Sequence, residues 1–120
     1  MTTPAQQEII VRTYLKAMEA GDLDATLACF DPEGVVHSPV YGEVPVAPFY
    51  RKLFDDTISA SVRIHTIYAA AGDAAGRWAA HFAYEWVRKD DVRIDTDLVD
   101  LFEFSGTSGL IKSLKIIFDR

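Results

Sequence analysis

The chain has 120 residues, of which 49% are apolar and 25% are charged, proportions typical of one ordinary soluble domain spanning residues 1–120. Its net charge of -6 and its 12 scattered Lys and Arg residues argue against a surface for nucleic acid or anionic membranes. The N-terminus lacks the features of a signal peptide, no stretch suits a bilayer span, and the single cysteine, Cys29, has no internal disulfide partner. These features predict a cytoplasmic protein.

Two helices are predicted at the beginning of the chain. Thr3, Pro4 and Gln6 supply a hydroxyl cap, a proline in the first turn and a capping-box partner. The apolar stripe that follows has helical spacing and ends at Gly21. Asp22 can cap a second, shorter helix directly afterwards.

Turns and one further helix are predicted in the middle of the chain. Residues 31–34 and 41–43 have turn composition, and residues 35–40 form a short extended piece that Pro39 keeps at a sheet edge or a bend. Aromatic and aliphatic residues at helical spacing predict a third helix over residues 46–57.

The second half of the chain has β character. Residues rich in β-branched and aromatic side chains predict strands over residues 62–71, 75–89, 94–104 and 110–118. The predicted fold is therefore α+β, with three N-terminal helices covering one face of a curved antiparallel sheet of four to five strands.

One of these strands carries a carboxylate within an apolar face. A period of two places Asp100 on the face formed by Ile94, Thr96, Leu98, Phe102 and Phe104. Burying an ionised carboxylate among such residues is costly. Asp100 is therefore expected to find polar partners, to keep its proton or to line a cavity, unless it lies at a frayed edge or in structural hydrogen bonds.

A hairpin with Asp90 and Asp91 as its two turn residues predicts the neighbours of Asp100. In this register His81 lies opposite Asp100, and Glu85 lies on the same face among small residues that leave room for a ligand. A bulge or a longer loop would shift the register. The opposite face would carry the aromatic side chains, which predicts a subunit interface formed by Trp78, Phe82, Tyr84 and Trp86.

The sequence contains no motif for a metal or a cofactor. His37, His65 and His81 lie far apart in different predicted elements, and His37 and His65 are interpreted as surface or structural residues. The sequence also has no glycine-rich phosphate loop and no nucleophile elbow. We expect neither a metal nor a cofactor from these patterns.

Residues 11–25, 30–39, 49–51 and 97–104 form four segments that match a known family, and the last contains the run Asp-Leu-Val-Asp. These segments resemble the bacterial ketosteroid isomerases and, more broadly, the nuclear-transport-factor-2-like superfamily, which includes polyketide cyclases of the SnoaL type, scytalone dehydratase and limonene epoxide hydrolase. The resemblance implies a cone of helices and bent sheet around an apolar pocket for a small hydrophobic molecule. It also implies a homodimer paired through the outer face of the sheet.

The resemblance further implies roles for individual residues. In the isomerases a carboxylate moves a proton next to a ring ketone, while a tyrosine and a protonated carboxylic acid donate hydrogen bonds to the enolate oxygen. Tyr14 matches that tyrosine and Asp100 matches the acid. Tyr50 matches a supporting tyrosine, and Phe118 falls where the family often has a pocket tryptophan.

The proton-carrying aspartate of the isomerases has no counterpart in this chain. Ser38 occupies its position before Pro39, and a serine hydroxyl cannot act as a general base at neutral pH.

Two functional hypotheses follow from this replacement. In the first, the chain is an isomerase, cyclase or dehydratase in which Tyr14 polarises the substrate and His81, oriented by Asp100, moves the proton while Ser38 and Glu85 position the substrate. In the second, the chain is a non-catalytic protein that binds a small molecule or acts as a dimeric interaction module. The physical cost of keeping several ionisable groups around one cavity favours the enzyme.

Overall fold

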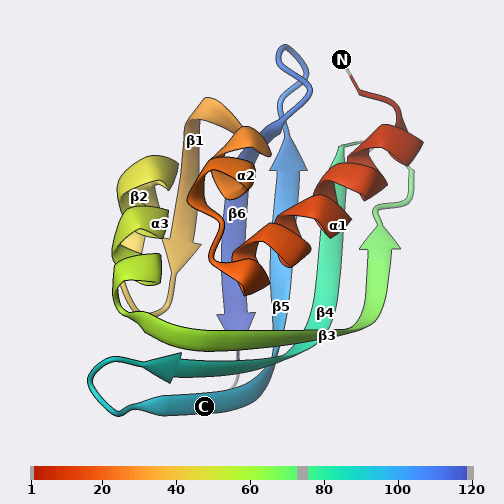
Figure 1. The fold of residues 1–120 in the computed structure, drawn as a ribbon. Helices are drawn as coiled ribbons and strands as arrows, with labels where there is room; N and C mark the ends of the chain where they lie inside the picture. Colours follow the sequence, from red (N-terminus) through yellow and green to blue (C-terminus); the bar gives the residue numbers. More distant parts are fainter. Residues whose placement is uncertain (1, 73–75, 119–120) are drawn as a thin grey trace.

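The computed structural model describes residues 2–72 and 76–118 and contains an α+β domain in which helices cover one face of a bent sheet (Figure 1). The helices of this part of the chain are α1 (Pro4–Ala20), α2 (Leu23–Ala28) and α3 (Val46–Asp55). Its strands are β1 (Phe30–Ser38), β2 (Gly42–Pro45), β3 (Thr57–Ala69), β4 (Arg77–Arg88), β5 (Arg93–Phe104) and β6 (Ile111–Phe118).

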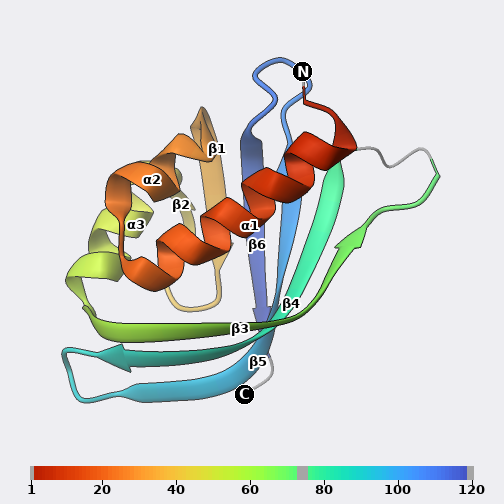
Figure 2. The same ribbon diagram turned by 45° about the vertical axis from the view of Figure 1, so that its right-hand side comes forward.

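The sheet has the strand order β2-β1-β6-β5-β4-β3, and its neighbours are antiparallel except for the parallel pair β1 and β6. Strands β3, β4 and β5 curve strongly, and α1 runs diagonally across the concave side of the sheet (Figure 2). The predicted fold class is confirmed, with a sixth strand, β2, where residues 41–43 predict only a turn.

The capping residues predicted at the start of the chain are confirmed. The Thr3 hydroxyl accepts a hydrogen bond from the Gln6 backbone N–H at 3.2 Å, and the Gln6 side chain accepts one from the Thr3 N–H at 2.8 Å. Gly21 ends α1 with φ at 68°, a left-handed conformation that glycine adopts without steric cost. The Asp22 carboxylate caps α2 by accepting from the Ala25 N–H.

Strand β1 begins earlier than the sequence predicts, at Phe30, so the expected turn over residues 31–34 lies inside the strand. The pairing with β6 shifts register between Phe30 and Val35, and this irregularity accommodates the turn-forming residues. A Cβ atom on Gly34 would lie 3.2 Å from the Ile111 carbonyl oxygen and 3.0 Å from the Asp31 carbonyl oxygen. The close approach of β1 to β6 therefore favours glycine at this position, because a side chain would have to displace its neighbours by a few tenths of an ångström.

The predicted register of the β4–β5 hairpin is wrong by one residue. Asp100 pairs with Ala80, and His81 pairs with Val99. The connection contains three residues, not two, because the Arg88 N–H donates to the Val92 carbonyl at 2.9 Å and Asp91 takes a left-handed φ of 66°. A shift of one residue turns every side chain of a strand to the opposite face.

The corrected register places the aromatic side chains of β4 on the concave face. Phe82, Tyr84 and Trp86 are buried in the core, and Trp78 is packed against it. The expected interface formed by these residues is therefore wrong, because they pack inside the domain. A homodimer paired through the outer face stays a prediction that needs other residues.

The core lies between the helices and the concave face of the sheet. Tyr14 packs edge-on against Phe30 and Phe102, with ring centroids 5.5 and 5.6 Å apart, an arrangement that aromatic pairs favour. Cys29, which follows α2, is buried. Within residues 2–72 and 76–118, none of the helices combines the length and the apolar character that crossing a membrane requires.

Candidate active site in the apolar cavity

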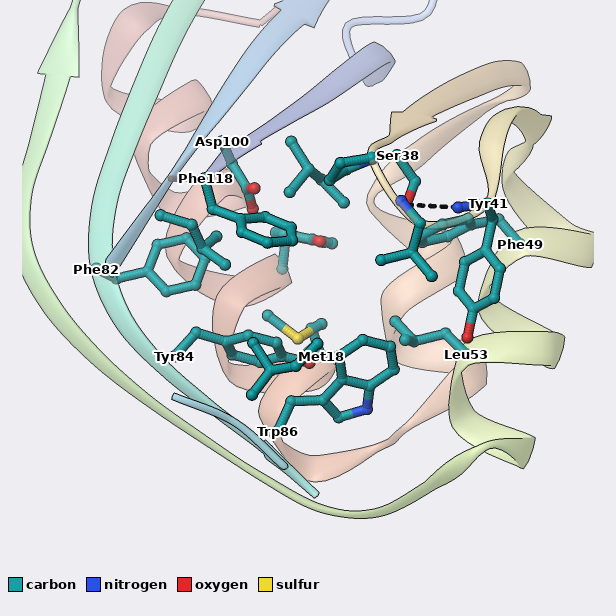
Figure 3. Close-up of a pocket in the computed structure, with 16 residues that line it drawn as sticks. Met18, Ser38, Tyr41, Phe49, Leu53, Phe82, Tyr84, Trp86, Asp100 and Phe118 are labelled. Atoms are coloured by element: carbon teal, nitrogen blue, oxygen red, sulfur yellow. Dashed lines mark hydrogen bonds between the residues drawn. The ribbon is translucent and has the colours of Figure 1, made fainter. Parts of the chain in front are cut away.

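A cavity of about 50 Å³ lies between the helices and the concave face of the sheet (Figure 3). Apolar and aromatic side chains of α1, α3 and strands β4 to β6 make up most of its wall, including those of Met18, Phe49, Leu53, Phe82, Tyr84, Trp86 and Leu98. Of these residues, only Leu98 lies on the face of β5 that the sequence predicts beside Asp100, and those from α1, α3 and β4 were not expected in the pocket. The aromatic side chains on one face of β4 could have indicated these positions, because a face so rich in aromatic residues is usually buried in the core.

Asp100 supplies the one carboxyl group among the described residues that line this cavity. Only 1% of its surface is exposed, and its Oδ1 atom is buried without a hydrogen-bond partner in the part of the chain that the structure describes. Burial raises the pKa of Asp100 to about 8, because the apolar surroundings disfavour the ionised form. Of the outcomes expected from the sequence, Asp100 therefore lines a cavity, and its raised pKa favours the protonated form.

Tyr14 lines the same cavity and is hydrogen-bonded to Tyr50. Their hydroxyl oxygens lie 2.6 Å apart, and both side chains are almost fully buried. Burial raises the pKa of each tyrosine well above its usual value, and the nearby Asp100 carboxyl raises both further. Both phenols therefore keep their protons, and Tyr50 supports Tyr14 from behind the wall of the cavity.

Replacing Tyr50 with phenylalanine is expected to destabilise the protein by about 1 to 3 kcal/mol, because the buried Tyr14 hydroxyl loses its partner. Urea unfolding of the two proteins measures the difference. The matched control is Tyr68→Phe, which removes the same hydroxyl from a side chain that is 53% exposed. Equal stability of the Tyr50 and Tyr68 variants would show that the buried pair contributes nothing.

Ser38 lines the cavity and also holds the turn after β1. Its hydroxyl oxygen accepts hydrogen bonds from the backbone N–H groups of Val40 and Tyr41 at 3.0 and 3.2 Å (Figure 3). The Tyr41 hydroxyl donates to the Asp56 carboxylate at 2.9 Å, which ties this turn to the end of α3. The side chain at the position of the isomerase base therefore stabilises a turn.

His81 and Glu85 lie on the outer face of the sheet, which corrects their predicted places beside Asp100. Glu85 forms an ion pair with Arg93 at 2.6 Å, and the His81 ring packs against that of His65, with centroids 4.8 Å apart. Neither residue lines the cavity. The one-residue error in the hairpin register accounts for both corrections.

Phe118 lines the cavity, as the resemblance implies, and lies near its mouth. Val40, Ile94 and Phe118 border both the cavity and an adjoining surface hollow of about 500 Å³. A volume of 50 Å³ holds only a few water molecules. A ring-sized ligand would therefore extend from the cavity past these three side chains into the hollow.

Comparisons with known proteins agree with this architecture. Residues 11–114 match the family model described as the SnoaL-like domain. The epoxide hydrolase/cyclase-like enzyme SalBIII, which has a role in pyran ring formation in the polyether salinomycin, superposes with a TM-score of 0.81 at 19% identity, over 99% of this chain and 95% of that one. These values show a shared fold.

Two further solved structures share the fold. An LEH-like epoxide hydrolase of M. tuberculosis gives a TM-score of 0.77 at 18% identity, over 96% of this chain and 84% of its own. A protein of Catenulispora acidiphila with a ketosteroid isomerase-like fold, in complex with trimethylamine, gives 0.76 at 16% identity, over 98% and 88%. The family match covers most of the chain, and the chain therefore belongs to the SnoaL-like family.

Proposed function

We propose that this protein binds a small hydrophobic ring or carbonyl compound in its cavity and moves a proton on it, with Asp100 as the acid–base group. The observation that carries the proposal is the buried Asp100 carboxyl in a mostly apolar wall, with a pKa raised to about 8. A general acid or base is most effective when its pKa lies near the working pH. Asp100 can therefore both take up and release a proton under physiological conditions.

The proposed step is a proton transfer at the carbon next to a carbonyl group. The ionised Asp100 removes a proton from that carbon, and the electron pair of the C–H bond forms an enolate. Asp100 then returns the proton to the same carbon or to another one. Ser38 offers no carboxylate for this transfer, so Asp100 takes the role of the missing base. In the isomerases, by contrast, the matching acid serves as a neutral hydrogen-bond donor.

Tyr14 would stabilise the negative charge that develops on the substrate oxygen. When Tyr50 donates to the Tyr14 oxygen at 2.6 Å, the Tyr14 hydroxyl proton is available to the cavity. A donor placed before the reaction in a site of low polarity stabilises an enolate more strongly than water does. Phe118 and the other aromatic side chains of the wall would hold the ring of the substrate.

Deuterium uptake tests the proposed transfer. A panel of cyclic ketones and enones is incubated in heavy water with the protein, and exchange at carbon is followed by NMR. Because a general base contributes typically a factor of 10²–10⁴, Asp100→Asn is expected to lower the exchange rate at least about 100-fold. The matched control, Glu103→Gln, neutralises a carboxylate on the outer face of the same strand, away from the cavity and the hollow, and is expected to leave exchange unchanged.

The pH profile gives an independent readout of the same proposal. Because the reaction uses ionised Asp100, the exchange rate is expected to rise about tenfold per pH unit and to level off near the Asp100 pKa of about 8. A rate that does not change over this range, or that is equal in wild type and Asp100→Asn, would overturn the proposal.

A non-catalytic binding protein is the second candidate, and the hydrogen bonds of Ser38 favour it. The residue at the position of the isomerase base accepts from two backbone N–H groups and holds a turn. This candidate predicts that members of the panel bind and raise the unfolding temperature while their carbons take up no deuterium.

A further inference from the structure

Two histidines and an aspartate meet on the outer face of the sheet, away from the cavity. They are His65 on β3, His81 on β4 and Asp97 on β5, three neighbouring strands (Figure 1). The Nε2 atom of His65 lies 3.0 Å from the Oδ1 atom of Asp97, and the ligand atoms of the three side chains all lie within 4.8 Å of one another. The proposed function uses none of these residues.

An irregularity in β3 brings His65 to this position. Ile64 pairs with Phe82 and Thr66 pairs with His81, so His65 is an extra residue without a cross-strand partner. A bulge of this kind redirects a side chain. On β4, the residue paired with Asp97 is Ala83, whose small side chain leaves room for His65 to reach across that strand to the aspartate.

We propose that His65, His81 and Asp97 form a binding site for a divalent transition-metal ion such as Zn²⁺. Two neutral imidazoles and one carboxylate are ligands that this class of ion prefers, with bond lengths of about 2.0–2.2 Å. Around a tetrahedral ion such ligand atoms lie about 3.3 Å apart. The present ligand atoms lie up to 4.8 Å apart, so the side chains would have to rotate toward the ion to reach that geometry.

The charges around the cluster act in both directions. The Asp97 carboxylate is exposed and accepts a hydrogen bond from the His65 ring at 3.0 Å, so a cation can reach it. The Arg63 guanidinium also lies near this carboxylate, and its positive charge opposes metal binding. We therefore expect moderate affinity, with the remaining coordination position occupied by water.

The sequence could not predict this site from spacing. The ligands come from three different strands, and only the register of β3, β4 and β5 together with the bulge at His65 brings them side by side. This distinguishes the cluster from zinc sites in which two ligands lie within one short motif.

Metal titration of the untagged protein tests the proposal. Calorimetry with Zn²⁺ and visible absorption with Co²⁺ are expected to show one ion bound per chain, with the Co²⁺ spectrum typical of nitrogen and oxygen ligands. His65→Gln, His81→Gln and Asp97→Asn are each expected to weaken binding at least tenfold. The matched control is His37→Gln, which removes a histidine whose Nδ1 atom lies 3.5 Å from a Glu43 carboxylate oxygen, in the β1–β2 pair at the opposite edge of the sheet.

Thermal unfolding provides a second readout that also checks the folding of each variant. The three residues lie at or near the surface, so without metal their variants are expected to unfold at the wild-type temperature. Because an ion that binds only the folded state stabilises it, Zn²⁺ is expected to raise the unfolding temperature of the wild type and of His37→Gln alone. Equal affinity in all four variants, or a loss confined to His37→Gln, would overturn the proposal.

Discussion

Replacing Asp100 with asparagine is expected to stabilise the protein by about 4 kcal/mol at pH 7 and to leave its stability unchanged near pH 4. The folded-state pKa of Asp100 is raised from 3.8 to about 8 by burial. Between these two values the unfolded chain releases the proton while the folded protein retains it. Asp100 therefore lowers the free energy of unfolding only above about pH 4. From there the wild type loses about 1.4 kcal/mol per pH unit until the pH reaches about 8.

Urea unfolding at a series of pH values measures this effect. The difference between Asp100→Asn and wild type is expected to grow steadily from pH 4 to pH 8, because asparagine cannot ionise and all other groups titrate alike in both proteins. Asp95→Asn serves as the control, since Asp95 is exposed. A difference that stays constant with pH would mean that Asp100 is not held neutral by its surroundings. The expected gain is large beside a typical total stability of 5–15 kcal/mol.

This stability prediction and the proposed function depend on the same side chain. A carboxyl group that destabilises the folded protein by several kcal/mol at neutral pH needs a compensating use. Higher stability of Asp100→Asn together with loss of deuterium exchange would identify that use as proton transfer. Higher stability with no exchange in either protein would fit the binding candidate.

Replacing Phe102 with alanine is expected to destabilise the protein by about 3 to 5 kcal/mol. Its side chain is 2% exposed and pairs across the sheet with Trp78 on one side and Leu114 on the other. Its ring centroid also lies 5.6 Å from that of Tyr14, in a T-shaped arrangement. The substitution leaves a cavity that the surrounding sheet cannot fill, and it removes the support for the tyrosine of the candidate site.

The neighbouring residue provides the matched control for Phe102. Leu101 lies on the opposite face of β5 and is 39% exposed, so Leu101→Ala is expected to cost about 1 kcal/mol or less. Phe102→Leu keeps most of the volume and is expected to cost about 1.5 kcal/mol. Chemical unfolding orders the three variants, and equal costs for Phe102→Ala and Leu101→Ala would contradict the structure of the core.

Local signals in the sequence predicted much of this fold. The caps at Thr3 and Asp22 and the glycine that ends α1 each depend on a few adjacent residues, and the structure confirms them. The inward face of β5, with Asp100 among apolar residues, follows from a period of two and is also confirmed. Such features need no knowledge of what the segment packs against.

The neighbours of Asp100 depended on the length of one turn, which the sequence left open. Asp90 and Asp91 suggested a two-residue connection, whereas the left-handed Asp91 closes a three-residue one. The incorrect register predicted His81 in the pocket and the aromatic residues of β4 on the outer face. Comparing the two faces of β4 would have favoured the observed register, because burying aromatic rings stabilises far more than burying a histidine and a glutamate.

The parallel pairing of β1 with β6 has a consequence for the newly made chain. Strand β1 ends at Ser38 and its partner begins at Ile111, so translation at 5–20 residues per second leaves one edge of β1 without a partner for about 4 to 15 s. An open strand edge is a template for pairing with another chain. The interval before β6 is made is therefore when a chaperone would protect this protein most.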